Sequence, residues 1–308
     1  MCPTWIASIG RRRNNFAGLV GSHPKNKGLD GMARNLVFIV LDSCRYDSFL
    51  RARTPNFDSI DVAEQRWSYA SWTAPSHYAY LMGLVPHRSP QHVYASEVYK
   101  KDFSDWVERL DIPNLGFASF VPQLSLPKLL KDHGYHCVGR VSMPVLNGFT
   151  LVSKFFDDYQ LMPNHNDFAS MVEQIEFAPD RPTFYFMNLG ETHYPYMLTG
   201  EDLPHISGVH GAAKLLAAGQ DAGGRVPPDG SADFFDDQQM KFLHEQQIRC
   251  VEYVDGVFAR LLEKAPADTY FMVMADHGEA FGEGGYFGHG PVMHEMAFQV
   301  PFLEGLRP

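Results

Sequence analysis

The chain has 308 residues, of which 45% are hydrophobic, enough for one large domain with a sizeable core. It carries 26 basic and 36 acidic residues, a formal net charge of −10 at pH 7, which argues against a nucleic-acid-binding surface because such surfaces are basic. No apolar run reaches the roughly 18 residues of a membrane-spanning helix. The four cysteines show no paired spacing, which favours buried free thiols and a cytoplasmic location; they are Cys2, Cys44, Cys137 and Cys250.

The first 33 residues are polar, basic and glycine-containing, so we expect residues 1–33 to form a disordered tail. Within it, Arg11-Arg12-Arg13 is not followed by an apolar segment, which argues against a secretory signal. We expect one folded domain over residues 34–308.

The first strong strand pattern is the apolar run from Asn35 to Leu41, which is typical of a central parallel strand. It is followed directly by Asp42. Ligands of open α/β sheets bind at the carboxyl ends of such strands, so Asp42 is a candidate metal ligand.

A helix is expected after Ser71-Trp72-Thr73-Ala74-Pro75, because proline suits the first turn of a helix. Thr73 then lies at or just before the helix N-terminus. Its hydroxyl would face unpaired backbone N–H groups and the positive end of the helix dipole, a place suited to an anion. A plain N-cap threonine is the alternative interpretation.

The middle of the chain alternates helix and strand signals. A short helix is predicted to end at Gly134, with a strand over residues 135–141 after it. A second apolar strand covers residues 183–189 and is followed by Glu191 and His193. His193 is equally consistent with a solvated loop residue and with a functional one.

Residues 205–233 are rich in Gly, Ala, Asp and Pro and are interpreted as an insertion, either a substrate lid or a solvated loop. After it, apolar residues recur at spacings of three and four from Ile248 to Leu262, which predicts a helix packed on the sheet.

The last strand pattern, Tyr270 to Met274, delivers Asp276 and His277 at its carboxyl end. Another histidine follows in Gly288-His289-Gly290. A carboxylate and an imidazole at a strand end indicate a metal and acid/base site. The alternative is a turn in which Asp276 caps a helix and the histidines are exposed.

Taken together, these segments resemble the sulfatase family within the alkaline-phosphatase-like superfamily of metal-dependent hydrolases and transferases. The similarity runs in order from Asn35 to Gly305. The segments that carry it include Leu41-Asp42 with Arg45, Thr54-Pro55-Asn56-Phe57-Asp58, Thr73-Ala74-Pro75-Ser76-His77, Asn188 to Tyr196, Asp276-His277-Gly278-Glu279, and Gly288-His289-Gly290.

The chain departs from the family's pattern at several positions. Thr73 stands where sulfatases have the Cys or Ser that becomes formylglycine, and its β-methyl group rules out that conversion. His77 stands where the family has Arg, and Ser43 where it has a second Asp. Gly139-Arg140-Val141-Ser142 aligns loosely with a segment that holds sulfate, but lacks its His. A Thr nucleophile is similar to the arrangement of phosphoryl-handling relatives, such as phosphodiesterases and phosphoethanolamine transferases.

The resemblance implies an α/β fold, an alkaline-phosphatase-like mostly parallel sheet flanked by helices, without the sulfatase C-terminal subdomain. It implies a metal-dependent hydrolase or transferase that acts on phosphate mono- or diesters through a covalent phosphothreonine. The implied metal ligands are Asp42, Thr73, Asp276 and His277. The mixed oxygen and nitrogen set favours zinc or manganese over calcium.

The other implied roles are proton transfer by His193 and His289, and substrate binding by Arg45, His77 and Arg140. A second metal is poorly supported, because Glu191 is the only acid near His193. The expected partner is a small-molecule or lipid-like phosphoester, and a second chain of a homo-oligomer could close the pocket. The alternatives are a sulfuryl-ester hydrolase without formylglycine and an inactive binding member of the fold.

Overall fold

In the computed structural model of the protein, the described residues are 35–83, 105, 108, 111, 113, 125–196, 237–290 and 294–308. The predicted tail, residues 1–33, and the predicted insertion, residues 205–233, lie outside them, so both stay predictions.

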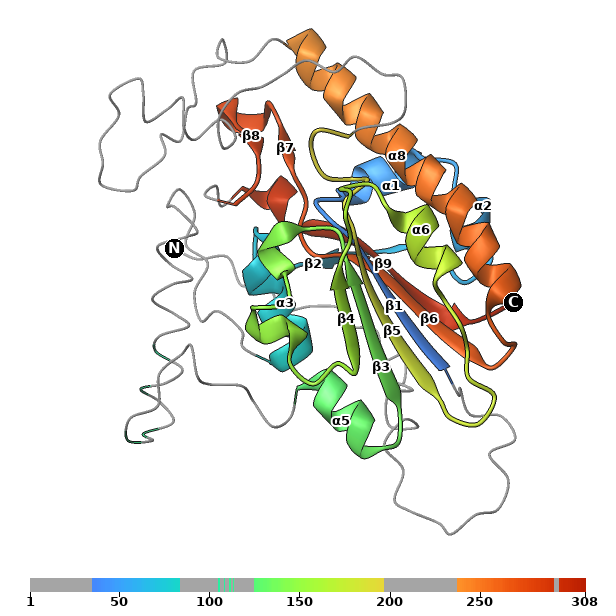
Figure 1. Cartoon of the computed structure of the whole chain (residues 1–308). Coiled ribbons are helices and arrows are strands. Elements are labelled where there is room, and N and C mark those ends of the chain that lie inside the picture. Colours follow the sequence, from blue (N-terminus) through green and yellow to red (C-terminus); the bar gives the residue numbers. More distant parts are fainter. Residues whose placement is uncertain are drawn as a thin grey trace, which may run out of the picture. The chain divides into compact units, whose positions relative to one another are not determined.

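A seven-stranded, mostly parallel sheet forms the centre of the domain (Figure 1). Five neighbouring strands are parallel. At one edge the strand of residues 299–306 pairs antiparallel with the last of them, and the strand of residues 64–67 pairs antiparallel with that one. The order across the sheet is β2 (Glu64–Trp67), β9 (Gln299–Leu306), β6 (Thr269–Ala275), β1 (Asn35–Leu41), β5 (Thr183–Leu189), β3 (His136–Val141) and β4 (Asp158–Leu161). The predicted α/β class is confirmed.

Strand β1 lies between β6 and β5, and it is buried on both faces, as its continuous apolar sequence requires. Leu41, its last residue, pairs with Leu189 of β5 on one side and with Ala275 of β6 on the other. The residues that follow these three positions therefore emerge at the same edge of the sheet. This register brings Asp42 and Asp276 together.

Helices cover both faces of the sheet (Figure 1). One face carries α1 (Tyr46–Arg51), α2 (Pro55–Asp58), α6 (Phe168–Glu173) and α8 (Asp237–Lys264). The other carries α3 (Thr73–Met82) and α5 (Leu126–Asp132). None of the helices within the described ranges has the length and apolar character to cross a membrane.

Shorter elements complete the description. A two-stranded hairpin, β7 (Ala280–Phe281) with β8 (Phe287–Gly288), forms a separate sheet. The 3₁₀ turns are η3 (Pro144–Leu146), η4 (Leu151–Ser153), η5 (Glu283–Gly285) and η6 (Glu295–Ala297).

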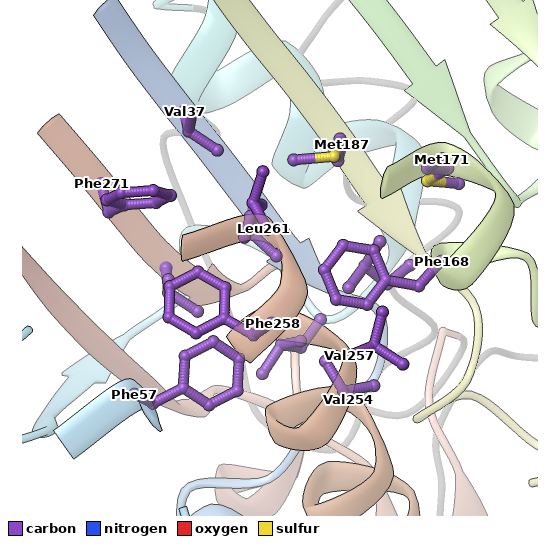
Figure 2. Packing of buried hydrophobic residues seen from close by; sticks show 14 of the residues in the cluster. Val37, Phe57, Phe168, Met171, Met187, Val254, Val257, Phe258, Leu261 and Phe271 are labelled. Carbon is purple, nitrogen blue, oxygen red and sulfur yellow. The ribbon is translucent and has the colours of Figure 1, made fainter. Parts of the chain in front are cut away.

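The larger core lies between the sheet and α8 (Figure 2). Phe258 of α8 stacks on Phe57 of α2, with ring centroids 4.5 Å apart, and meets Phe271 of β6 edge-on at 5.3 Å. All three side chains are fully buried. The contacts join α2, α8 and the sheet, so this cluster holds the α8 layer in place.

The described cysteines are Cys44, Cys137 and Cys250, and each is buried and free. This agrees with the absence of paired spacing in the sequence.

Replacement of Phe258 by Ala should lower the free energy of unfolding by about 3–5 kcal/mol, because a large buried side chain leaves a cavity. Urea unfolding measures the change. The matched control is Phe242→Ala on the same helix, where the side chain is 38% exposed. The control should change stability by about 0.5 kcal/mol or less. Equal effects of the two substitutions would contradict this account of the core.

Candidate active site

Three ionisable side chains meet at the carboxyl edge of the sheet. Asp42 follows β1, and Asp276 and His277 follow β6. Each offers one ligand atom, all within 4.8 Å of one another, and all three side chains are fully buried. His277 Nε2 lies 3.3 Å from Asp276 Oδ2 and 3.7 Å from Asp42 Oδ1. We call these three residues the Asp–Asp–His cluster.

The tautomer of His277 follows from its other ring nitrogen. Nδ1 lies 2.9 Å from the backbone carbonyl oxygen of Gly278. A carbonyl oxygen only accepts hydrogen bonds, so Nδ1 donates, and Nε2 presents its lone pair to the two carboxylates. A backbone carbonyl that fixes a ring in this way is typical of histidines that bind metals.

Asp42 is held by hydrogen bonds to both of its carboxylate oxygens. Asn188 Nδ2 donates to Oδ2 at 2.9 Å, and Ser43 Oγ donates to Oδ1 at 3.3 Å. Burial acts to raise the pKa of Asp42, but the nearby His193 and His277 and the Asn188 hydrogen bond outweigh it and lower the pKa. Asp42 is therefore the carboxylate that carries the charge.

Asp276 is held through one oxygen only. Its Oδ1 accepts the backbone N–H groups of Ser43, at 3.2 Å, and His277, at 3.0 Å. Its Oδ2 is buried and has no hydrogen-bond partner. Burial and the neighbouring Asp42 raise the pKa of Asp276 well above its usual range. A buried carboxylate oxygen without a partner is costly, and a cation at the cluster would satisfy it. The residues therefore fit a divalent metal.

Thr73 is the first residue of α3 and is buried, with Trp72 before it in an extended conformation. Thr73 Oγ1 lies 3.2 Å from His277 Nε2, beside the Asp–Asp–His cluster. The N-cap of α3 is Trp72, so Thr73 is the first helical residue and not a plain N-cap. Its hydroxyl lies beside the cluster.

His77 lies on the next turn of α3, with its ring against Tyr80 and Phe186, at 4.8 and 5.7 Å between centroids. Its Nδ1 donates to the Thr73 carbonyl oxygen at 2.7 Å, and its buried Nε2 has no partner. Burial lowers the pKa of His77 to about 4. The ring is therefore neutral near pH 7 and does not supply the positive charge of the arginine found there in the family.

Four histidine rings form a row at this edge of the sheet. His277 and His289 have centroids 4.3 Å apart, His289 and His193 5.0 Å, and His193 and His165 5.5 Å. Burial lowers the pKa of His193. The structure thus brings His193 and His289 to the cluster. His165, in the loop between β4 and α6, was missed because nothing in its polar sequence context distinguishes it.

Arg45 lies near the cluster, but its guanidinium is committed elsewhere. It bonds to Asp47 through Nε and Nη2, at 2.7 Å each, and to Glu283 through Nη1, at 2.5 Å. It also lies over the Phe281 ring, 5.3 Å from the centroid. These contacts attach the loop after β1 to the β7–β8 hairpin. The sequence predicted a substrate-binding role, whereas in the structure the buried guanidinium is paired with two partly exposed carboxylates.

Arg140 is not brought to the cluster. Its guanidinium bonds to Asp158 at 2.5 Å, to Gln174 at 3.0 Å and to the Gly139 carbonyl oxygen at 2.9 Å. Asp158 is the first residue of β4 and pairs with Val138, two residues before Arg140. The Arg140 side chain therefore points away from the carboxyl edge of the sheet. The sequence predicted a substrate contact for Arg140, but in the structure these neighbours bind its guanidinium instead.

Gln247 of α8, which no sequence pattern marks, hydrogen-bonds to both loops that carry the site. Its Nε2 donates to the carbonyl oxygens of Ser43, at 2.9 Å, and Thr192, at 3.0 Å. Its Oε1 accepts from Ser48 Oγ at 2.6 Å and from the Arg45 backbone N–H at 3.3 Å. The loops after β1 and β5 are therefore held by one buried amide.

Glu191, just past β5, is also buried. Its Oε1 accepts the backbone N–H of Phe168 at 2.8 Å, and its Oε2 has no hydrogen-bond partner. Burial raises the pKa of Glu191 to about 7. Its bond to α6 makes Glu191 part of the scaffold, and no contact of its carboxylate with the Asp–Asp–His cluster is recorded among the described residues.

Comparison with known proteins places this geometry in context. The family model described as Sulfatase matches residues 34–304. No curated protein sequence matches the chain significantly.

Several solved structures share the fold. The soluble domain of lipooligosaccharide phosphoethanolamine transferase A from Neisseria meningitidis superposes with a TM-score of 0.54 at 13% identity, covering 91% of this chain and 78% of that one. The periplasmic domain of EcEptC from Escherichia coli, in complex with Zn, gives 0.50 at 14%, covering 90% and 74%. A 2-O GAG sulfatase gives 0.52 at 12%, covering 89% and 64%. At these identities the likeness shows the fold.

Glu191 should make stability depend on pH. Its pKa is raised from 4.5 to about 7 in the folded protein, so the folded state holds a proton that the unfolded state has lost between these values. The stabilisation is therefore full below about pH 4.5 and is lost as pH rises through about 7. A shift of this size corresponds to about 3 kcal/mol.

Urea unfolding of wild type and Glu191→Gln at pH 5 and pH 8 measures this effect. The variant should gain stability relative to wild type on going to pH 8, by up to about 3 kcal/mol. Glu263→Gln, the same change at an exposed position of α8, should show no such trend. A difference between Glu191→Gln and wild type that does not vary with pH would rule out the assignment.

Proposed function

Because the chain belongs to the sulfatase family, we propose that it is a metal-dependent hydrolase or transferase acting on phosphate mono- or diesters. The observation that carries the proposal is the Asp–Asp–His cluster with the Thr73 hydroxyl beside it, 3.2 Å from His277 Nε2. The occurrence of phosphoethanolamine transferases among the structures of the same fold supports phosphoryl chemistry.

The identity of the nucleophile separates phosphate from sulfate chemistry. A threonine cannot be converted into formylglycine, because its β-carbon carries a methyl group. Thr73 can act directly, since hydroxyl side chains serve as nucleophiles once activated. The buried hydroxyl at the start of α3 is also close to the unpaired N–H groups and positive dipole end of a helix, which favour an anionic phosphoryl group.

A divalent metal, zinc or manganese, would be held by Asp42, Asp276, His277 and Thr73 Oγ1. The unpartnered Asp276 Oδ2 and the lone pair of His277 Nε2 suit this ligand set. When bound, the metal supplies positive charge that lowers the pKa of the threonine hydroxyl and offsets the negative charge of the phosphoryl group.

The residues then divide the reaction between them. Thr73 gives up its hydroxyl proton to solvent, its Oγ1 attacks phosphorus, the bond from phosphorus to the leaving oxygen breaks, and a phosphothreonine forms. His289 or His193, in its protonated form, donates a proton to the departing oxygen. Water or an acceptor hydroxyl then attacks the phosphothreonine, its proton returns to the histidine, and the bond from phosphorus to Thr73 Oγ1 breaks, which restores Thr73. A small or lipid-like phosphoester is the proposed substrate class.

Turnover of nitrophenyl phosphate and nitrophenyl sulfate by the metal-loaded protein tests the proposal. We expect the phosphate to be the faster substrate. Thr73→Ala should abolish turnover, because it removes the nucleophile, while the matched variant Thr73→Ser should retain activity, because it keeps a hydroxyl.

Faster turnover of the sulfate would favour the sulfuryl-ester hydrolase. Retention by Thr73→Ala of more than roughly a tenth of wild-type activity would make water the nucleophile and exclude the phosphothreonine. Absence of turnover of either ester by metal-loaded protein would favour a binding member of the fold.

A further inference from the structure

We propose that Gln247 and Thr192 are positioning residues for the Asp–Asp–His cluster. Together they lock the peptide that joins Asp42 to Ser43, so that the N–H of this peptide points at the Asp276 carboxylate. The inference rests on the proposed function, because it concerns how firmly the cluster holds a metal. In this proposal both residues act through the backbone, and neither contacts metal or substrate.

The peptide between Asp42 and Ser43 has a hydrogen bond at each end. Its N–H donates to Asp276 Oδ1 at 3.2 Å, and its carbonyl oxygen accepts from Thr192 Oγ1 at 2.7 Å. All four residues are buried. A hydrogen bond that breaks there is not replaced by bulk water, so each is costly to lose. The orientation of this one peptide therefore decides whether Asp276 keeps a donor from the loop after β1.

The backbone of Ser43 opposes this orientation. Its φ is 62°, in the left-handed region, which is costly for a residue with a β-carbon. Ser43 is the third residue of a turn that the Cys44 N–H closes on the Leu41 carbonyl oxygen, at 3.2 Å. A positive φ at that position usually calls for glycine or asparagine. A flip of the Asp42–Ser43 peptide would relieve the φ angle, and it would break both hydrogen bonds of the peptide.

Gln247 opposes the flip by holding the chain on both sides of the peptide. Its Nε2 donates to the carbonyl oxygens of Ser43, at 2.9 Å, and Thr192, at 3.0 Å. Its Oε1 accepts from Ser48 Oγ, at 2.6 Å, and from the Arg45 backbone N–H, at 3.3 Å. Two acceptors face one end of the amide and two donors face the other, so only one orientation satisfies them. The amide is thus fixed in place, and it is fully buried.

The locked peptide arranges the cluster before a metal binds. Asp276 Oδ1 accepts two backbone N–H groups, from Ser43 and His277, and Oδ2 has no hydrogen-bond partner, which leaves it for a cation. With the Ser43 N–H turned away, one donor remains and the carboxylate can rotate. A group that must be ordered on binding costs affinity. Loss of the lock should therefore weaken metal binding without removing a metal ligand.

Gln247→Met tests the lock, because methionine has a similar size and makes none of the four hydrogen bonds. It is combined in turn with Ser43→Ala and Ser43→Gly, which both lack the serine hydroxyl. Alanine keeps the cost of a positive φ, whereas glycine adopts this φ readily.

Competition with a chelator measures the Kd for Zn²⁺. In the Ser43→Ala protein, Gln247→Met should raise this Kd about five- to thirtyfold, since nothing then offsets the cost of the left-handed conformation. In the Ser43→Gly protein the rise should be less than about threefold, because glycine has no such cost. Equal rises in the two backgrounds would overturn the lock.

Gln246→Met is the matched control. Gln246 precedes Gln247 on α8 and is also buried, but its Oε1 has no hydrogen-bond partner. Its substitution should change the Kd by less than about twofold in either background, because among the described residues it shares no hydrogen-bond partner with Ser43. If Gln247→Met does not fold, Thr192→Val, which removes the other hold on the peptide, takes its place with the same expectations.

Hydrogen exchange of the metal-free protein gives a second readout that needs no metal. The Ser43 N–H should be protected in wild type and should exchange faster in Gln247→Met and in Thr192→Val. The Phe57 N–H, which donates to Asp255 Oδ1 at 2.8 Å, is the matched backbone group and should keep its protection. Unchanged protection of the Ser43 N–H, or an equal loss at Phe57, would overturn the proposal.

The two readouts separate this inference from the proposed function. If the wild-type protein binds no metal, the proposed function fails, and exchange of the Ser43 N–H alone decides on the lock. If Zn²⁺ binds and Gln247→Met weakens its binding equally in both backgrounds, the lock is overturned while the metal site stands. A loss confined to the Ser43→Ala background supports both.

Discussion

Two carboxylates buried side by side are the constraint on which the rest of the site depends. The ligand atoms of Asp42 and Asp276 lie within 4.8 Å of each other, and both side chains are fully buried. Two unit charges about 4 Å apart interact by about 4 kcal/mol even at an effective dielectric constant of about 20. Without a cation, the repulsion between the two carboxylates is avoided because only one of them is ionised. The pKa of Asp42 is lowered and that of Asp276 is raised. A divalent cation between them would allow both carboxylates to be ionised.

The scaffold explains how the chain tolerates the arrangement. Strand β1 lies between β5 and β6, so their carboxyl ends fall at one edge and set the positions of Asp42 and Asp276. Gln247 then joins the loops after β1 and β5 from the side of α8. Arg45 joins the first of these loops to the hairpin that carries His289. The site thus lies at the ends of the central strands, and polar side chains with several partners each hold its loops in place.

The central strands and the site residues at their ends could be predicted from the sequence, for a physical reason. A parallel strand buried on both faces must be apolar throughout, so β1 and β5 are recognisable over their full lengths, 35–41 and 183–189. The strand ends then locate Asp42, Asp276 and His277. Thr73 is located by a different pattern, because Pro75, two residues after it, indicates the first turn of a helix.

The rest could not be predicted, because it depends on contacts between distant segments. The short elements β4 and α6 have no clear periodicity. Whether Arg45 and Arg140 bind substrate depends on whether Glu283 and Asp158 reach them first, which only the packed structure shows. Glu279 lies within a recognised motif, yet its bond to His289 arises from the hairpin register.

Elemental analysis of the purified protein tests the central claim most directly. The account predicts about one zinc or manganese ion per chain, as the single ligand set of the cluster implies. Asp276→Asn should lose most of this metal, whereas His136→Ala, a partly exposed histidine at the start of β3, should keep it. Metal-free protein that retains full activity in the presence of a chelator would contradict the account.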